Sequence, residues 1–159
     1  MNVMEMTSEE VKTAIKQGKL MISVYGLGWM GLPTACLFAE AGANVIGVDI
    51  DQRVIELIKR GESPVDEEGV QSILTNVVNN RLKVTTDLRE AASQSNIIII
   101  VVPTLIDERK KPDYSALEKD AKEIGMKFNK GSIIIVESTV GPGITESIVK
   151  ESVEENSGM

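Results

Sequence analysis

Three glycines with the spacing Gly-x-Gly-x-x-Gly are the first residues of this sequence whose arrangement points to a chemistry. They are Gly26, Gly28 and Gly31, and an apolar run comes directly before them. In a strand–turn–helix unit the first glycine allows a tight turn, the second lets a pyrophosphate approach the backbone, and the third lets the helix pack on the strand. The free N–H groups and the partial positive charge at the helix start favour phosphate. The spacing therefore predicts a dinucleotide site.

An acidic residue at the next strand end narrows the predicted dinucleotide to NAD. Asp49 lies about 20 residues beyond the first glycine, as the dinucleotide motif requires. Its carboxylate would accept hydrogen bonds from the adenosine ribose and would repel the 2′-phosphate of NADP. Arg53 follows one helical turn later, where it stacks on the adenine, pairs with Asp49, or faces solvent. At this point it stays open whether the glycines only make a tight turn.

Apolar runs and helical periodicities alternate along the chain. The apolar runs predict strands at 20–25, 44–48, 82–85, 96–102 and 131–136. The periodicities predict helices at 8–17, 51–60, 67–79, 87–92, 114–128 and 144–155, and one that follows the glycine turn and ends near residue 40; residues 103–113 read as a polar loop. The alternation indicates the α/β class, with a Rossmann-type, doubly wound parallel sheet in three layers and the strand order 3-2-1-4-5.

The domain organisation follows from the same pattern. Residues 1–19 read as an N-terminal helical extension, and residues 20–159 as an NAD-binding Rossmann domain. A full Rossmann sheet has six strands, so we expect this sheet to be truncated after its fifth or sixth strand. We therefore expect the chain to be a piece of a longer protein that carries substrate and C-terminal domains.

The composition excludes several classes of function. The chain has no histidine and a single cysteine, Cys36, so metal sites of the Cys/His kind and Ser-His-Asp catalysis are excluded, and we expect no metal. The net charge of -7 argues against nucleic acid and anionic membranes as partners. No apolar run reaches the roughly 18 residues of a membrane span, and the N-terminus lacks the pattern of a signal peptide. We expect a cytoplasmic protein.

Four segments in order resemble the UDP-glucose/GDP-mannose dehydrogenase family. They are GLGWMGLPTACLFAEAGANVIGVDID (26–51), GESPVDEEGV (61–70), VVPT (101–104) with the loop to Lys-Pro-Asp (111–113), and ESTVGPG (137–143). The resemblance covers residues 20–150. Two departures stand out: Trp29-Met30 replaces the family's Tyr-Val or Tyr-Ile, and Leu105 replaces the proline that usually follows Val-Pro-Thr.

The resemblance implies roles for the matched residues. Trp29 and Met30 would contact the dinucleotide through their backbone, and Thr104 would lie near the cofactor. Thr139 would lie by the nicotinamide, where it orders a water molecule or the substrate hydroxyl; the alternative is that it caps the following helix. We do not assign a catalytic role to Glu137.

The resemblance also implies a reaction: members of the family oxidise C6 of a nucleotide sugar to the carboxylate with two NAD, and for this sequence we expect a UDP-sugar, UDP-N-acetylmannosamine or UDP-glucose. The family's catalytic cysteine, lysine and aspartate lie in the second half of a longer chain, and its members assemble as homodimers or larger homo-oligomers. Cys36 sits among small and apolar residues of the first helix after the glycine turn, so we expect it to be a buried thiol. The 159 residues alone are expected to bind NAD and to be inactive.

Two other functions remain open from the sequence. One is the NAD domain of a β-hydroxyacid dehydrogenase, whose glycine segment is similar; the 61–70 segment and the Pro112-Asp113 loop favour the nucleotide-sugar family instead. The other is a non-enzymatic module that senses NAD, because a fold by itself does not define a function.

Overall fold

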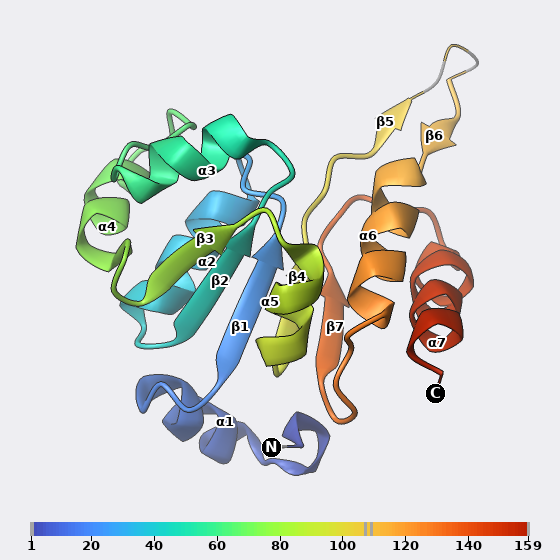
Figure 1. Cartoon of the computed structure of the whole chain (residues 1–159), viewed down its shortest axis with the longest axis horizontal. Coiled ribbons are helices and arrows are strands. Elements are labelled where there is room, and N and C mark those ends of the chain that lie inside the picture. The colour runs from blue at the N-terminus through green and yellow to red at the C-terminus, as the bar shows by residue number, and fades with distance from the viewer. Residues whose placement is uncertain (1, 107, 109, 159) are drawn as a thin grey trace.

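In the computed structural model the chain forms a five-stranded parallel sheet with helices on both faces (Figure 1). The structure describes residues 2–106, 108 and 110–158; Asp107 and Arg109 of the predicted polar loop lie outside the described residues, as do Met1 and Met159. The strand order is β3-β2-β1-β4-β7. This order confirms the predicted 3-2-1-4-5 arrangement and the doubly wound Rossmann-type fold.

The five strands are short and mostly apolar. They are β1 (Met21–Tyr25), β2 (Asn44–Val48), β3 (Leu82–Thr85), β4 (Ile97–Ile100) and β7 (Ile133–Val136). All neighbours pair in parallel, with Ile22 opposite both Val45 and Ile97. Because helices cover both faces, successive residues of one strand enter different cores: Val24 packs into one and Tyr25 into the other.

Helices cover the two faces in separate groups. One face carries α2 (Gly31–Glu40), α3 (Gln52–Lys59) and α4 (Val70–Val77). The other carries α5 (Leu88–Gln94), α6 (Ser115–Gly125) and α7 (Glu151–Ser157), with a π-helical turn at Thr145–Lys150 that leads into α7. Together with the sheet these groups make the predicted three layers.

The N-terminal segment packs below the amino ends of the strands (Figure 1). It consists of a 3-10 turn, Val3–Glu5, and helix α1, Ser8–Lys16. Thr7 caps α1 through a reciprocal capping box with Glu10. Val3, Ala14 and Leu20 form a small apolar cluster there. The boundary at residue 19 stays a prediction.

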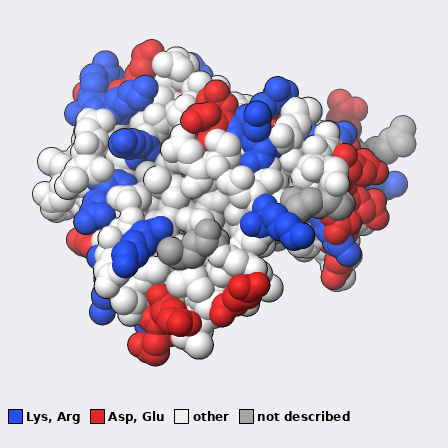
Figure 2. Space-filling model, turned by 60° about the horizontal axis from the view of Figure 1, so that its bottom comes forward, with Lys and Arg blue, Asp and Glu red and all other residues white. Residues whose placement is uncertain are grey.

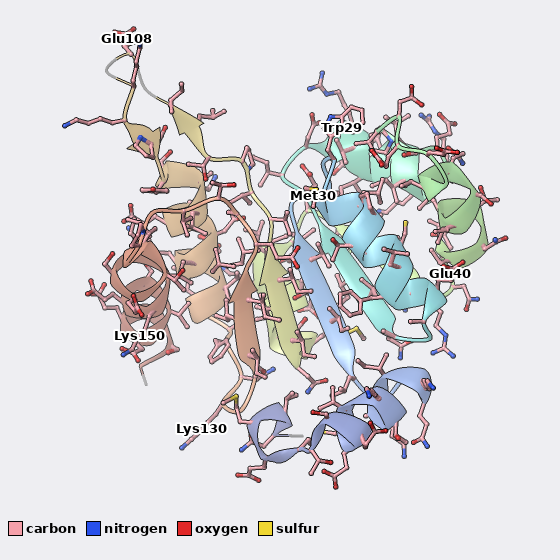
Figure 3. The ribbon with its side chains drawn as sticks, turned by 180° about the vertical axis from the view of Figure 1, so that it is seen from behind. Trp29, Met30, Glu40, Glu108, Lys130 and Lys150 are labelled. Carbon is pink, nitrogen blue, oxygen red and sulfur yellow. The ribbon has the colours of Figure 1, made fainter. Side chains whose placement is uncertain are left out.

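The predicted polar loop at 103–113 contains a short hairpin instead. Strands β5 (Leu105–Ile106) and β6 (Pro112–Asp113) pair in the antiparallel sense. The hairpin extends away from the sheet, and Glu108 lies near its tip (Figures 1 and 3). A strand of two residues is too short to show an alternation of apolar and polar residues, so the sequence pattern did not predict these two strands. Strand β4 also ends at Ile100, before the predicted Val102, although Val101 N still donates to Tyr25 O at 2.8 Å.

Both basic and acidic side chains lie on the face that carries α1, and Figure 2 shows them there in small separate groups. Across the described part of the chain, no helix combines the length and the apolar character needed to cross a membrane.

Candidate cofactor site

The glycine turn brings β1 and α2 into direct backbone contact. Gly26 has a φ of +94°, and a Cβ there would lie 2.5 Å from the carbonyl oxygen of Val101. A Cβ at Gly31 would overlap the carbonyl oxygen of Gly26. At Gly28, by contrast, a Cβ would meet no atom within 4 Å. The first and third glycines are thus required by packing, and the second leaves open space above the backbone.

That open space is part of a cavity of about 630 Å³ at the carboxyl edge of the sheet. Ligands of open α/β sheets bind at this edge, where the order of the strands reverses. Helix α2 starts here with Met30 as its N-cap, and no side chain caps it. Trp29 and Met30 line the cavity, are 61% and 67% exposed, and lie above the end of β1 (Figure 3). The uncapped helix start and Gly28 fit a pyrophosphate.

Asp49 is held in place by the backbone beside the turn. One carboxylate oxygen accepts a hydrogen bond from Leu27 N at 2.9 Å, and the other accepts one from Asp51 N at 2.9 Å. These two bonds fix the carboxylate at the end of β2, where it lines the cavity. Each oxygen keeps a further lone pair, so the group can still accept hydrogen bonds from ribose hydroxyls.

Arg53 faces solvent, which was one of the three alternatives, and it pairs with a carboxylate other than that of Asp49. Its Nη2 lies 2.8 Å from the carboxylate of Asp51, and its side chain is 87% exposed. Asp51 also caps α3, and its hydrogen bonds with Arg53 lower the pKa of its carboxyl. Arg53 therefore pairs with Asp51 rather than with Asp49, and it is not among the residues that line the cavity. Its role as a cofactor contact stays a prediction.

Thr104 and Thr139 line the other end of the cavity together with Glu137. The two threonines are linked, because Thr104 Oγ1 donates a hydrogen bond to Thr139 O at 2.8 Å. Ser138 Oγ donates to Val102 O at 2.8 Å and ties the same two loops together. Thr139 caps no helix, since Ile144 occupies the N-cap position of the next helical segment.

Cys36 lies inside α2 and is 1% exposed. Burial raises the pKa of its thiol to about 11, and Glu40 adds to the rise. A buried thiol with a high pKa is a poor nucleophile, which agrees with the expectation that Cys36 is a packing residue.

Three residues of α6 complete the cavity, and the sequence reasoning missed all of them. They are Ala116, Lys119 and Asp120. Asp120 is 6% exposed, and burial raises the pKa of its carboxyl to about 6. The charge of Lys119 works against that rise, and the charges of Asp49 and Glu123 add to it. The sequence did contain one indication that Asp120 is buried. Position 120 lies on the same helical face as the apolar Leu117, Ala121 and Ile124.

We expect Asp120→Asn to stabilise the fold at neutral pH. The folded protein holds the Asp120 proton up to about pH 6, whereas the ordinary pKa is 3.8. Between these values the folded state binds more protons than the unfolded state, so stability falls as the pH rises. The asparagine amide does not ionise, so the variant avoids this loss of stability. We expect its free energy of unfolding to exceed that of the unmodified chain by roughly 2 kcal/mol at pH 8, and the difference to vanish near pH 4.

Urea unfolding of both proteins from pH 4 to pH 8 measures the gain. Glu118→Gln is a matched control, because it removes a carboxylate of the same helix that pairs with Lys122 outside the cavity. A stability difference between Asp120→Asn and the unmodified chain that does not change with pH would contradict the prediction.

The comparisons with known proteins identify the family. The sequence model described as the UDP-glucose/GDP-mannose dehydrogenase family, NAD binding domain, matches residues 20–159. A UDP-N-acetyl-D-mannosamine dehydrogenase of Campylobacter jejuni is 37% identical over 87% of this chain and 33% of its own length. The enzyme of the same name from Pyrococcus horikoshii is 38% identical, over 82% of this chain and 31% of its own. The chain thus spans about a third of the length of these curated relatives.

Solved structures give the same result. A GDP-mannose dehydrogenase from Pseudomonas aeruginosa superposes with a TM-score of 0.82 at 34% identity, over 87% of this chain and 33% of that one. A UDP-D-ManNAc dehydrogenase from Pyrococcus horikoshii gives 0.82 at 36% identity, over 88% and 33%. The match of the family model over residues 20–159 includes the glycine turn and all five strands, and it favours this family over the β-hydroxyacid dehydrogenases. The chain belongs to the UDP-glucose/GDP-mannose dehydrogenase family, of which it forms the NAD-binding domain, and NAD is its cofactor.

Proposed function

We propose that this chain binds NAD across the cavity at the carboxyl edge of the sheet. The observation that supports it is a single cavity that joins the glycine turn, Asp49 and the two threonines. The pyrophosphate would lie at Gly28 and the start of α2, with Trp29 and Met30 contributing backbone contacts. The adenosine ribose would lie at Asp49, and the nicotinamide near Thr104 and Thr139.

We further propose that the chain serves as the cofactor-binding part of an enzyme that oxidises C6 of a UDP-sugar to the carboxylate. UDP-N-acetylmannosamine is the first candidate, because the relatives named above are dehydrogenases of this sugar nucleotide; UDP-glucose is the second. NAD supplies a hydride acceptor, and two are used per sugar. Thr139 would order a water molecule or the substrate hydroxyl. The whole enzyme would assemble as a homodimer or a larger homo-oligomer.

The chain by itself is expected to bind NAD without oxidising a sugar. Cys36, its one cysteine, is buried in α2 and is outside the cavity. The nucleophile that captures the aldehyde would therefore come from the part of the relatives that this chain does not match.

Calorimetric titration of the chain with NAD and with NADP tests the site. We expect NAD to bind and NADP to bind at least about tenfold more weakly, because the Asp49 carboxylate repels the 2′-phosphate. Tighter binding of NADP would refute the role given to Asp49.

A protein that continues this chain through the remaining length of the relatives tests the reaction. Incubated with UDP-N-acetylmannosamine, UDP-glucose or GDP-mannose, it should form two NADH per molecule of the true substrate. The same assay on the 159 residues should give no NADH. Turnover by the short chain alone would overturn the division of roles proposed here.

A further inference from the structure

Asp120 is a buried carboxyl group without a partner in the wall of the cofactor cavity. Its residue is 6% exposed, and it lines the cavity from α6. Within the part of the chain that the structure describes, no hydrogen bond or ion pair joins its carboxyl to another residue. Among the described residues only Ser23 Oγ is a side-chain nitrogen or oxygen that is sealed from solvent and lacks a partner, so the Asp120 oxygens are open to the cavity and can accept hydrogen bonds there.

The neighbouring protein groups do not supply a donor. The Tyr25 hydroxyl, which lies near enough to interact electrostatically with Asp120, donates its single proton to Leu88 O at 2.8 Å. Lys119 directly precedes Asp120 on the same helix but forms no ion pair with it within the described residues. The Asp120 oxygens therefore remain available to a molecule that enters the cavity.

The location of Asp120 indicates which part of that molecule it meets. Asp49 and Asp120 both line the cavity, and they lie near enough for the charge of Asp49 to add to the rise in the pKa of Asp120. Ile50, Leu88 and Ala116 also line the cavity and offer apolar surface for a flat ring. In the proposed binding mode Asp49 takes the adenosine ribose, which places the adenine base beside Asp120. Adenine carries an amino group at its 6 position, a donor that a carboxylate accepts well.

We propose that Asp120 recognises the adenine base by accepting a hydrogen bond from its 6-amino group. The inference rests on the proposed NAD site and adds a determinant of base specificity to it. Asp49 would then select NAD against NADP at the ribose, while Asp120 selects adenine against purines that carry an acceptor at the same position.

Nicotinamide hypoxanthine dinucleotide is the probe for this selection, because a carbonyl oxygen replaces the amino group at position 6. We expect calorimetry to show NAD binding about tenfold more tightly than this analogue, since the carboxylate would face an acceptor. Asp120→Asn should bring the ratio to within about twofold of one or invert it, because the amide can donate to the carbonyl oxygen. The control Glu118→Gln should keep the ratio of the unmodified chain.

The outcomes separate this inference from the proposal on which it rests. A chain that binds neither dinucleotide would refute the NAD site itself. If both bind with equal affinity, or if Asp120→Asn weakens both by the same factor and leaves their ratio unchanged, the NAD site stands and the role of Asp120 is overturned. Because asparagine has nearly the shape of aspartate and is expected to stabilise the fold, misfolding of this variant does not obscure the result.

Discussion

Gly31→Ala is expected to destabilise the chain by roughly 3 kcal/mol or more and to abolish NAD binding. The added methyl group would overlap the carbonyl oxygen of Gly26 and would contact Val24 at 3.6 Å. Both the carbonyl and the start of α2 are backbone, so no side chain can rotate away. Relief requires α2 to move off β1, which separates the helix start from the turn. Urea unfolding and calorimetry with NAD measure the two effects.

Gly28→Ala is the matched control, since it adds the same methyl group three residues earlier. No atom lies within 4 Å of that position, so stability should stay within about 0.5 kcal/mol of the unmodified chain. NAD affinity should still fall by about tenfold or more, because the methyl group occupies the space through which the pyrophosphate approaches. Normal stability of Gly31→Ala, or normal NAD affinity of Gly28→Ala, would contradict the respective roles.

Asp49→Asn is expected to change the choice of dinucleotide. The amide keeps one oxygen for Leu27 N or Asp51 N but loses the charge and the second acceptor. NAD affinity should fall about tenfold, and the preference for NAD over NADP should fall by about tenfold to a hundredfold, because the repulsion of the 2′-phosphate disappears. Titrations with both dinucleotides give this ratio directly.

Asp51→Asn is the control for Asp49→Asn. It removes the same charge two residues away, and asparagine remains a good N-cap for α3. The ratio of NAD to NADP affinity should stay near that of the unmodified chain. An equal change in both variants would mean that the general negative field, and not a direct contact of Asp49, excludes NADP.

The residues that the sequence placed at strand ends come together in one cavity. Gly28, Asp49, Thr104 and Thr139 each follow a predicted strand, and parallel strands bring their carboxyl ends to one edge. The alternation of strands and helices is therefore enough to predict that these residues lie at one edge of the sheet. No knowledge of side-chain packing is needed for this prediction. This is why residues far apart in the sequence could be assigned to one site.

The features that the sequence did not predict depend on how a helix is oriented against its neighbours and on which local contacts form. Asp120 lies in a helix whose periodicity was clear, but the pattern does not tell which neighbour a buried helix face meets. Arg53 pairs with Asp51, whereas the Asp49 carboxylate is held by two backbone N–H groups, and the sequence does not show these local contacts. The hairpin at 105–113 depends on pairing between two residues per strand.

The hydrogen bond between Thr104 and Thr139 sets the polarity of the far end of the cavity. A threonine hydroxyl has one proton, and Thr104 has committed its proton to the carbonyl oxygen of Thr139. What Thr104 Oγ1 still presents is a lone pair. It can therefore accept a hydrogen bond from a ligand while its own proton stays on Thr139 O. A group that binds at this end therefore has to bring its own hydrogen-bond donor.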